Sequence, residues 1–342
     1  MRKLSEIFLK LLPALSYIPP LLILYVLDPV SFDRTWKGRA YYMFFMWAVL
    51  IETIQHWDNI KTEFGRVNPR RTLVFLMALL LPILYVFVSN FISFDNHHNL
   101  NQFMMELSRK CGMTDEWFIN NMPLAIEYLA FTVIFNIILL LGYGLNGVAK
   151  YSVSSFLLGL LGFSYLLDNL YPNGRFAPFQ VIVPTTTTLA AQFLKFMGYQ
   201  TSIIWGNYWI PTLIVWNDKG RAAFMVAWPC SGVDSLLLYS VVSIIFLKNI
   251  IASKKRIIAY FLVGAMITYL INILRITTIY IIAINHGDKS PEFYKFHEYY
   301  GPLYSIIWII IYPLIIIAIN FLWRKIKGKP TDIISLNKYL LG

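Results

Sequence analysis

Repeated apolar runs constrain the fold of this chain more than any other feature of its sequence. A helix needs about 20 predominantly apolar residues to cross a hydrocarbon core about 30 Å thick. Charged residues make up only 14% of the chain, against about a quarter in ordinary soluble domains. The runs that we expect to span a membrane lie at 7–28, 40–56, 72–93, 123–144, 152–170, 231–249, 257–284 and 301–323. The sequence therefore predicts an all-α polytopic membrane protein with about eight transmembrane helices.

Basic residues between these runs predict the orientation of the chain. Lys and Arg crowd the N-terminus, the loops near 57–71 and 250–256, and the tail at 324–342. Because cytoplasmic loops carry the excess of Lys and Arg, we expect both termini of this multi-pass protein on the cytoplasmic side of the cell membrane. The same bias accounts for the net charge of +11, so the charge does not indicate a nucleic-acid partner.

The segment before Cys230 has the composition of strands. Residues 202–216 and 222–228 are rich in β-branched and aromatic side chains, and Asn217-Asp218-Lys219-Gly220 between them is a turn signal. We predict a small extracytoplasmic β-hairpin that leads into the next span, with Cys230 at or near the helix N-cap. The preceding apolar stretch, 185–197, is rich in threonine and is expected to be an interfacial or re-entrant helix.

Three polar side chains are expected to meet at the outer face of the membrane. Cys230 lies at the outer end of one span, and His297 precedes the last span by about one turn. Arg275 lies about 27 Å along its helix from Ile257, at 1.5 Å per residue. That distance places Arg275 near the outer edge of a core about 30 Å thick. We therefore expect an active site that faces outside.

These residue types fit a cysteine-nucleophile enzyme. A thiolate is the nucleophile, and a helix N-terminus or a cation lowers the pKa of its thiol. An imidazole can take the thiol proton and return it to a leaving amine, and an Arg can bind a carboxylate or stabilise an oxyanion. Asn272 lies one turn before Arg275 and could orient it. Asp234, one turn below Cys230, could orient a partner or raise the thiol pKa by like-charge repulsion.

Other interpretations of the same residues stay open at this point. Cys111 is also predicted outside, and a Cys111–Cys230 disulfide would remove the nucleophile. His286 is an alternative outer histidine, and His297 could instead belong to an interfacial aromatic belt.

Two classes of protein without cysteine chemistry also compete. Intramembrane Glu127 and Arg275 leave a transporter as one alternative, although we find no internal repeat, and a non-catalytic membrane scaffold is the other. His97 and His98 lack a third plausible ligand, so we expect no metal site and no organic cofactor.

Short motifs on three of the expected spans resemble a known family. Pro229-Cys230-Ser231-Gly232, Asn272-Ile273-Leu274-Arg275 and His297 followed by Gly301 occur in this order, on one expected side of the membrane. In this arrangement the chain resembles the exosortase/archaeosortase family of polytopic membrane proteins, in its His-type variant. The resemblance implies a catalytic membrane core at 151–323, preceded by N-terminal transmembrane helices at 1–150 and followed by a basic cytoplasmic tail at 324–342.

The resemblance also implies an activity. It indicates a sortase-like cysteine protease and transpeptidase that cleaves the C-terminal sorting signal of exported proteins, which consists of a short motif, a hydrophobic helix and a basic tail. Cys230 would form a thioester, His297 would act as base and acid, and Arg275 would stabilise the oxyanion or hold the substrate. Ser231, Gly232, Asn272 and Asp234 would bind substrate or support the site. The acyl group would then pass to an acceptor, which in the archaeal branch of the family is a membrane lipid amine or alcohol.

Overall fold

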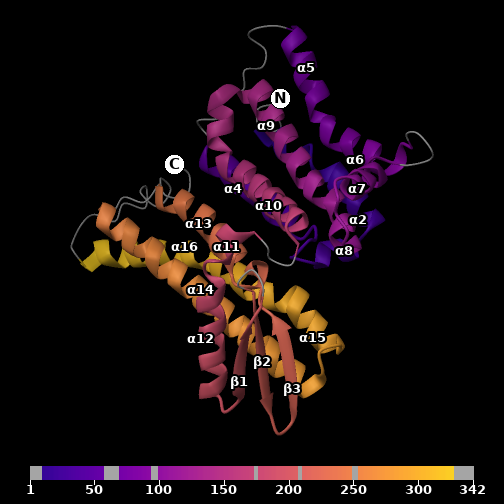
Figure 1. The fold of residues 1–342 in the computed structure, drawn as a ribbon. Helices are drawn as coiled ribbons and strands as arrows, with labels where there is room; N and C mark the ends of the chain where they lie inside the picture. The colour runs from indigo at the N-terminus through magenta and orange to yellow at the C-terminus, as the bar shows by residue number, and fades with distance from the viewer. Residues whose placement is uncertain are drawn as a thin grey trace. The chain divides into compact units, whose positions relative to one another are not determined.

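The computed structural model describes residues 10–57, 69–93, 99–172, 176–206, 210–248 and 253–326. Helices make up most of this part, with one small antiparallel sheet (Figure 1). The chain forms two compact units, unit 1 up to Leu170 and unit 2 from Tyr171. The helix over 152–170 belongs to unit 1, and the start of the catalytic core at 151 stays a prediction.

The described regular elements of unit 1 are helices, apart from one isolated β-bridge between Ser93 and Asn99, and its core lies around two long neighbouring helices. α9 packs on α10 and α5, and α10 also packs on α4. α9 and α10 approach closely, because a Cβ added at Gly162 would lie 2.9 Å from side-chain atoms of Tyr128 and Leu129. The helices are α2 (Ile18–Leu27), α3 (Val30–Asp33), α4 (Tyr41–Gln55), α5 (Pro69–Leu79), α6 (Leu81–Phe91), α7 (Leu100–Lys110), α8 (Glu116–Asn120), α9 (Met122–Lys150) and α10 (Ser152–Leu170).

Within the described ranges, five helical segments are long and apolar enough to cross a membrane. A sixth candidate is α5 with α6, which is bent by 41° where Pro82 lacks the amide that would continue the helix. The expected count of eight is not confirmed, because α4 has 15 residues and α13 is described over 16 residues. The five segments are Lys10–Leu27, Glu116–Lys150, Ser152–Leu170, Lys254–His286 and Pro291–Asn320.

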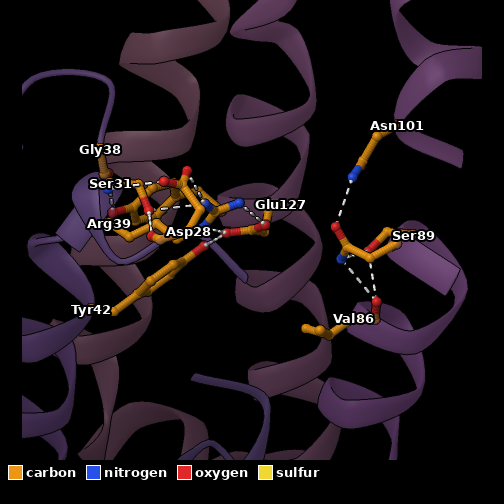
Figure 2. Close-up of polar contacts among 11 residues, drawn as sticks. Asp28, Ser31, Gly38, Arg39, Tyr42, Val86, Ser89, Asn101 and Glu127 are labelled. Carbon is orange, nitrogen blue, oxygen red and sulfur yellow. Dashed lines mark hydrogen bonds and ion pairs between the residues drawn. The ribbon is translucent and has the colours of Figure 1, made fainter. Parts of the chain in front are cut away.

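A partly buried ion-pair network links segments of unit 1 (Figure 2). Arg39 binds both carboxylate oxygens of Glu127, each at 2.8 Å, and also contacts Asp28 and Ser31. The Tyr42 hydroxyl donates to Glu127 at 2.9 Å. Glu127 is therefore part of a satisfied structural pair, which removes one of the two residues that suggested a transporter.

A second cation in unit 1 is buried beside the first. Lys37 is 6% exposed, forms an ion pair with Asp168 at 2.8 Å, and lies over the rings of Trp117 and Phe118. Burial lowers the pKa of Lys37 to about 8, and attraction to Asp168 opposes that shift. Lys37 thus fixes the segment before α4 to α8 and α10, and the hydropathy of the sequence does not predict this interaction.

Unit 2 contains the sheet and the helices α12, α13, α14 and α16, of which the last three all pack on one another. α14 packs on α12, α13 and α16, and α13 also packs on α16. The elements are α11 (Ala177–Gln180), α12 (Val183–Phe196), β1 (Gln200–Trp205), β2 (Pro211–Asn217), β3 (Gly220–Met225), the 3-10 turn η3 (Trp228–Cys230), α13 (Val233–Lys248), α14 (Lys254–His286), α15 (Pro291–Lys295), the π-helical turn η4 (Phe296–Tyr300) and α16 (Gly301–Ile326).

The sheet has three strands in the order β1-β2-β3, where the sequence predicted a hairpin. The stretch 202–216 was expected to be one strand, but the chain turns back within it, and the Gly206 amide bonds the Ile210 carbonyl. The predicted turn is correct: Asn217 pairs with Gly220, and the Asn217 side chain accepts from the Lys219 and Gly220 amides. α12, at 14 residues, is not among the candidate spans.

Candidate active site

Cys230 lies in a tight turn between the sheet and α13. Its amide bonds the Ala227 carbonyl at 3.0 Å, and Pro229 stands inside the same turn. The helix begins at Val233, with Gly232 accepting its first hydrogen bond from Leu236. Ser231 and Gly232 separate Cys230 from the helix, so Cys230 lies near the N-cap, as predicted, but Gly232, at a φ of +95°, is the residue that turns the chain into α13.

The main chain around Cys230 is held from two helices. The Asn272 side chain of α14 donates to the Cys230 carbonyl at 3.2 Å. Thr186 Oγ1 of α12 lies 3.1 Å from the Ser231 carbonyl oxygen and 2.8 Å from the Tyr269 hydroxyl. Cys230 is partly exposed while Ser231 is fully buried, so the main chain of the turn is fixed beside a cysteine that is not buried.

The turn is also anchored by Trp228 in the core of unit 2. Trp228 is fully buried and its ring packs against Phe179, with centroids 5.0 Å apart. The Ser231 hydroxyl donates to the Trp228 carbonyl at 2.8 Å. Ser231 thus closes the turn, which is a supporting role for one of the residues that the motif singled out.

α14 carries Arg275 at the point where the exposed apolar surface of this helix ends. Large apolar side chains are exposed on one stripe of this helix at every fourth residue, and the stripe stops at Leu274. Beyond Arg275 the helix continues to His286 and packs on the sheet, where the Tyr280 hydroxyl donates to the Leu213 carbonyl at 2.8 Å. The stripe consists of Ile258, Leu262, Met266, Leu270 and Leu274. Arg275 thus lies at the border between the apolar exposed surface and the sheet.

Arg275 binds the chain at His297. Its Nη2 donates to the His297 carbonyl at 3.3 Å, within a π-helical turn that precedes α16. Such turns often mark functional sites. A Cβ added at Gly301 would lie 2.9 Å from Nε of Arg275, so only glycine lets the guanidinium lie against this turn.

The His297 ring is the end of an aromatic stack that begins in the sheet. It stacks on Phe293 of α15 with centroids 5.8 Å apart, and Phe293 stacks on Phe224 of β3 at 5.3 Å. His297 is therefore oriented by the strand that leads to Cys230.

The structure brings most of the predicted site residues into one set of contacts. Asn272 links α14 to the cysteine turn, and Arg275 links α14 to the histidine turn. Asn272 was expected to orient Arg275; its Nδ2 instead binds the Cys230 carbonyl and its side chain packs against Gly232. Asp234 lies in the first turn of α13.

The competing residues are not part of this set of contacts. Neither cysteine is part of a disulfide, so the Cys111–Cys230 bridge is not formed. His286 is exposed at the end of α14, while His97 and His98 fall outside the described residues. In the described part of the chain, no group of three or more His, Cys, Asp or Glu could hold a metal ion.

Sequence reasoning missed Thr186, Tyr269, Tyr280 and Phe293. Thr186 belongs to the threonine-rich stretch that argued against a span at 185–197. That stretch was the feature of the sequence that could have pointed to Thr186. Tyr269, Asn272 and Tyr280 follow one another at helical spacing on α14, which a search for polar residues on one face could have found.

Comparison with known proteins gives one finding. A sequence model of the transmembrane exosortase family matches residues 36–315. The match includes Cys230, Arg275 and His297, and it extends over most of unit 1, beyond the 152–323 region where the motifs were read. No curated protein and no solved structure was found to match. Because the family match covers most of its length, this membrane protein belongs to the transmembrane exosortase family, whose members are cysteine transpeptidases.

Proposed function

We propose that this protein is a cell-membrane transpeptidase that cleaves the C-terminal sorting signal of exported proteins, with Cys230 as the nucleophile. The observation that carries the proposal is the geometry of α14. One turn of this helix holds both Asn272, which binds the Cys230 carbonyl, and Arg275, which binds the His297 carbonyl. Nucleophile, cation and imidazole thus belong to one supported framework, as covalent catalysis requires.

In the proposed reaction, the His297 imidazole takes the Cys230 thiol proton. The sulfur attacks the carbonyl carbon at the sorting motif, and the new oxyanion is stabilised by Arg275. The C–N bond then breaks, and the imidazolium returns its proton to the leaving amine. The product is a thioester on Cys230, which a lipid amine or alcohol attacks to release the sulfur and form the new amide or ester.

The position of the site relative to the membrane boundary indicates the class of substrate. The exposed apolar stripe of α14 ends at Leu274, next to Arg275, so the chemistry lies at the membrane boundary. With both termini in the cytoplasm, as the charge bias predicts, this boundary is the outer one. A substrate that ends in a membrane helix presents its cleavage site at that boundary.

The test is processing of a defined reporter. The reporter is a tagged exported protein encoded in the same genome that ends in a hydrophobic helix and a basic tail, co-expressed with the full-length enzyme. We expect Cys230→Ala to abolish removal of the tail, and Cys111→Ala, which removes the other cysteine, to leave it unchanged. A hydroxylamine-sensitive adduct on Cys230 would identify the thioester. Processing that survives Cys230→Ala would overturn the proposal.

The identity of the base is tested on the same reporter. His297→Ala should stop processing, while His286→Ala should not, because His286 lies exposed at the end of α14. The opposite result would transfer the role of base to His286.

A further inference from the structure

We propose that the free edge of β3 binds the extended sorting motif of the substrate by main-chain hydrogen bonds, as an added strand. This inference rests on the proposed function and names how its substrate is held. β3 is an outer strand of the sheet. An outer strand presents N–H and C=O groups on which an extended peptide can pair.

The register of the sheet shows which groups face outward. Asn217 and Gly220 close the turn, and the Val226 amide bonds the Pro211 carbonyl at 2.9 Å. Because hydrogen-bonded pairs alternate along an antiparallel ladder, Ala222 and Phe224 bond β2, while Arg221, Ala223 and Met225 direct their main-chain groups away from it. Within the described part of the chain, no hydrogen-bond partner is found for these outward groups.

The residues of β3 whose main-chain groups face outward are exposed. Arg221, Ala223 and Met225 all have exposed side chains, on the sheet face opposite the Tyr280 contact. Leu213, Val215 and Ala222 are buried on the face that carries that contact. The burial of β3 is therefore confined to one face, and the outward-facing residues are accessible.

The position of β3 along the chain favours it over the other edge strand. β3 leads directly into the cysteine turn, and Cys230 follows Met225 by about five residues. β1 instead leads into the connection to β2. The Phe224–Phe293–His297 stack joins β3 to the imidazole as well. A peptide paired with β3 would thus be directed at both the thiol and the histidine.

The direction of the bound peptide is also set. β3 runs toward Cys230 and therefore toward the membrane boundary. The substrate motif precedes a membrane helix, so its chain also runs toward the membrane. The peptide and β3 are then parallel strands. The main chain of the peptide makes the hydrogen bonds, and its side chains point alternately to the two faces of the sheet.

Cysteine cross-linking tests this pairing. The enzyme carries Cys111→Ser and Cys230→Ala with either Ala223→Cys or, as control, Ser202→Cys. Ala223 and Ser202 lie in the same row of the sheet, both paired with Ile214, and both are exposed, but on opposite edge strands. Single cysteines are placed at successive positions of the reporter before its terminal helix. We expect disulfides from Ala223→Cys at every second reporter position and few from Ser202→Cys.

A proline pair provides the kinetic test. Ala223→Pro removes an outward N–H and leaves the bonds to β2 intact, and proline is tolerated on an edge strand in this orientation. We expect kcat/KM for the reporter to fall about tenfold, which corresponds to about 1.4 kcal/mol. Thr201→Pro removes the equivalent outward N–H of β1 and should leave processing unchanged. Thermal unfolding of both variants checks that the fold is kept.

The outcomes separate this inference from the proposed function. Cross-links at every position, equal cross-linking from both edges, or only enzyme-to-enzyme disulfides at position 223 would overturn strand pairing with the substrate. Equal effects of the two prolines would overturn it as well. If Cys230→Ala abolishes processing while Ala223→Pro has no effect, the proposed function stands and this inference alone is wrong.

Discussion

Replacement of Gly232 by alanine tests whether the cysteine turn is held by Asn272. A Cβ at Gly232 would lie 2.9 Å from Cγ and Nδ2 of Asn272, which is closer than packed atoms allow. Asn272 is fully buried in α14, so the contact is relieved only if its side chain leaves the Cys230 carbonyl. The substitution therefore combines a backbone cost with the loss of a buried hydrogen bond.

The two costs can be separated with a matched glycine. Gly232 has a φ of +95° and Gly198 a φ of +92°, and a Cβ at Gly198 meets nothing within 4 Å. Gly198→Ala should cost only the left-handed strain, about 1–2 kcal/mol. Gly232→Ala should cost the same strain and, in addition, about 1–3 kcal/mol for a buried polar group left without its partner. A shift of the nucleophile by about 1 Å would further lower turnover about 100-fold.

Thermal unfolding in detergent and reporter processing measure the two effects. We expect Gly232→Ala to have the lower Tm of the two variants and to lose processing, and Gly198→Ala to retain it. In the double variant Gly232→Ala/Asn272→Ala the two contacts at 2.9 Å are removed and only the 3.1 Å contact with Cβ of residue 272 remains, so the stability losses should not add. Equal Tm and equal processing in the two glycine variants, or strictly additive losses in the double variant, would refute the role assigned to Asn272.

Two further predictions concern the charged residues of each unit. Arg275→Lys loses the planar fork that reaches the His297 carbonyl and should lower the processing rate about 100- to 1,000-fold without a change in Tm. The control is Arg256→Lys, at the exposed start of α14. Equal processing rates for the two variants would contradict an oxyanion role for Arg275. Glu127→Gln removes the carboxylate that pairs with the largely buried Arg39 and should destabilise the protein by about 3–5 kcal/mol. Thermal unfolding measures this loss. The control Glu116→Gln, in an exposed pair with Arg109, should leave the Tm unchanged.

The features that the sequence predicted correctly are those determined by neighbouring residues. The helix predicted at 152–170 is the helix observed, because its apolar run is continuous and of spanning length. The turn at Asn217–Gly220 was predicted because the Asn side chain bonds amides only two and three residues away. The nearness of Arg275 to the His297 turn followed from helix rise and charge bias.

The features that it missed depend on contacts between distant residues. The break between β1 and β2 falls within a stretch whose composition favours one long strand. Asn272 was assigned to Arg275 because the two lie one turn apart, yet its partner is 42 residues away in sequence. Lys37 and Arg39 lie outside the predicted apolar runs, yet each is paired with a carboxylate on a long helix. A linear pattern contains no information about such pairs.

These long-range contacts explain why the site can be rigid at a membrane boundary. Tyr269, Asn272, Arg275 and Tyr280 cover about three turns of α14, and each binds a different element: α12, the cysteine turn, the histidine turn and the sheet. In the proposed function, the bilayer would hold this helix of 33 residues along its exposed apolar stripe, and the end that carries Arg275 would be a fixed support. The proposed catalytic groups would then need no packed soluble domain around them, because one long helix contacts the turn that carries each of them.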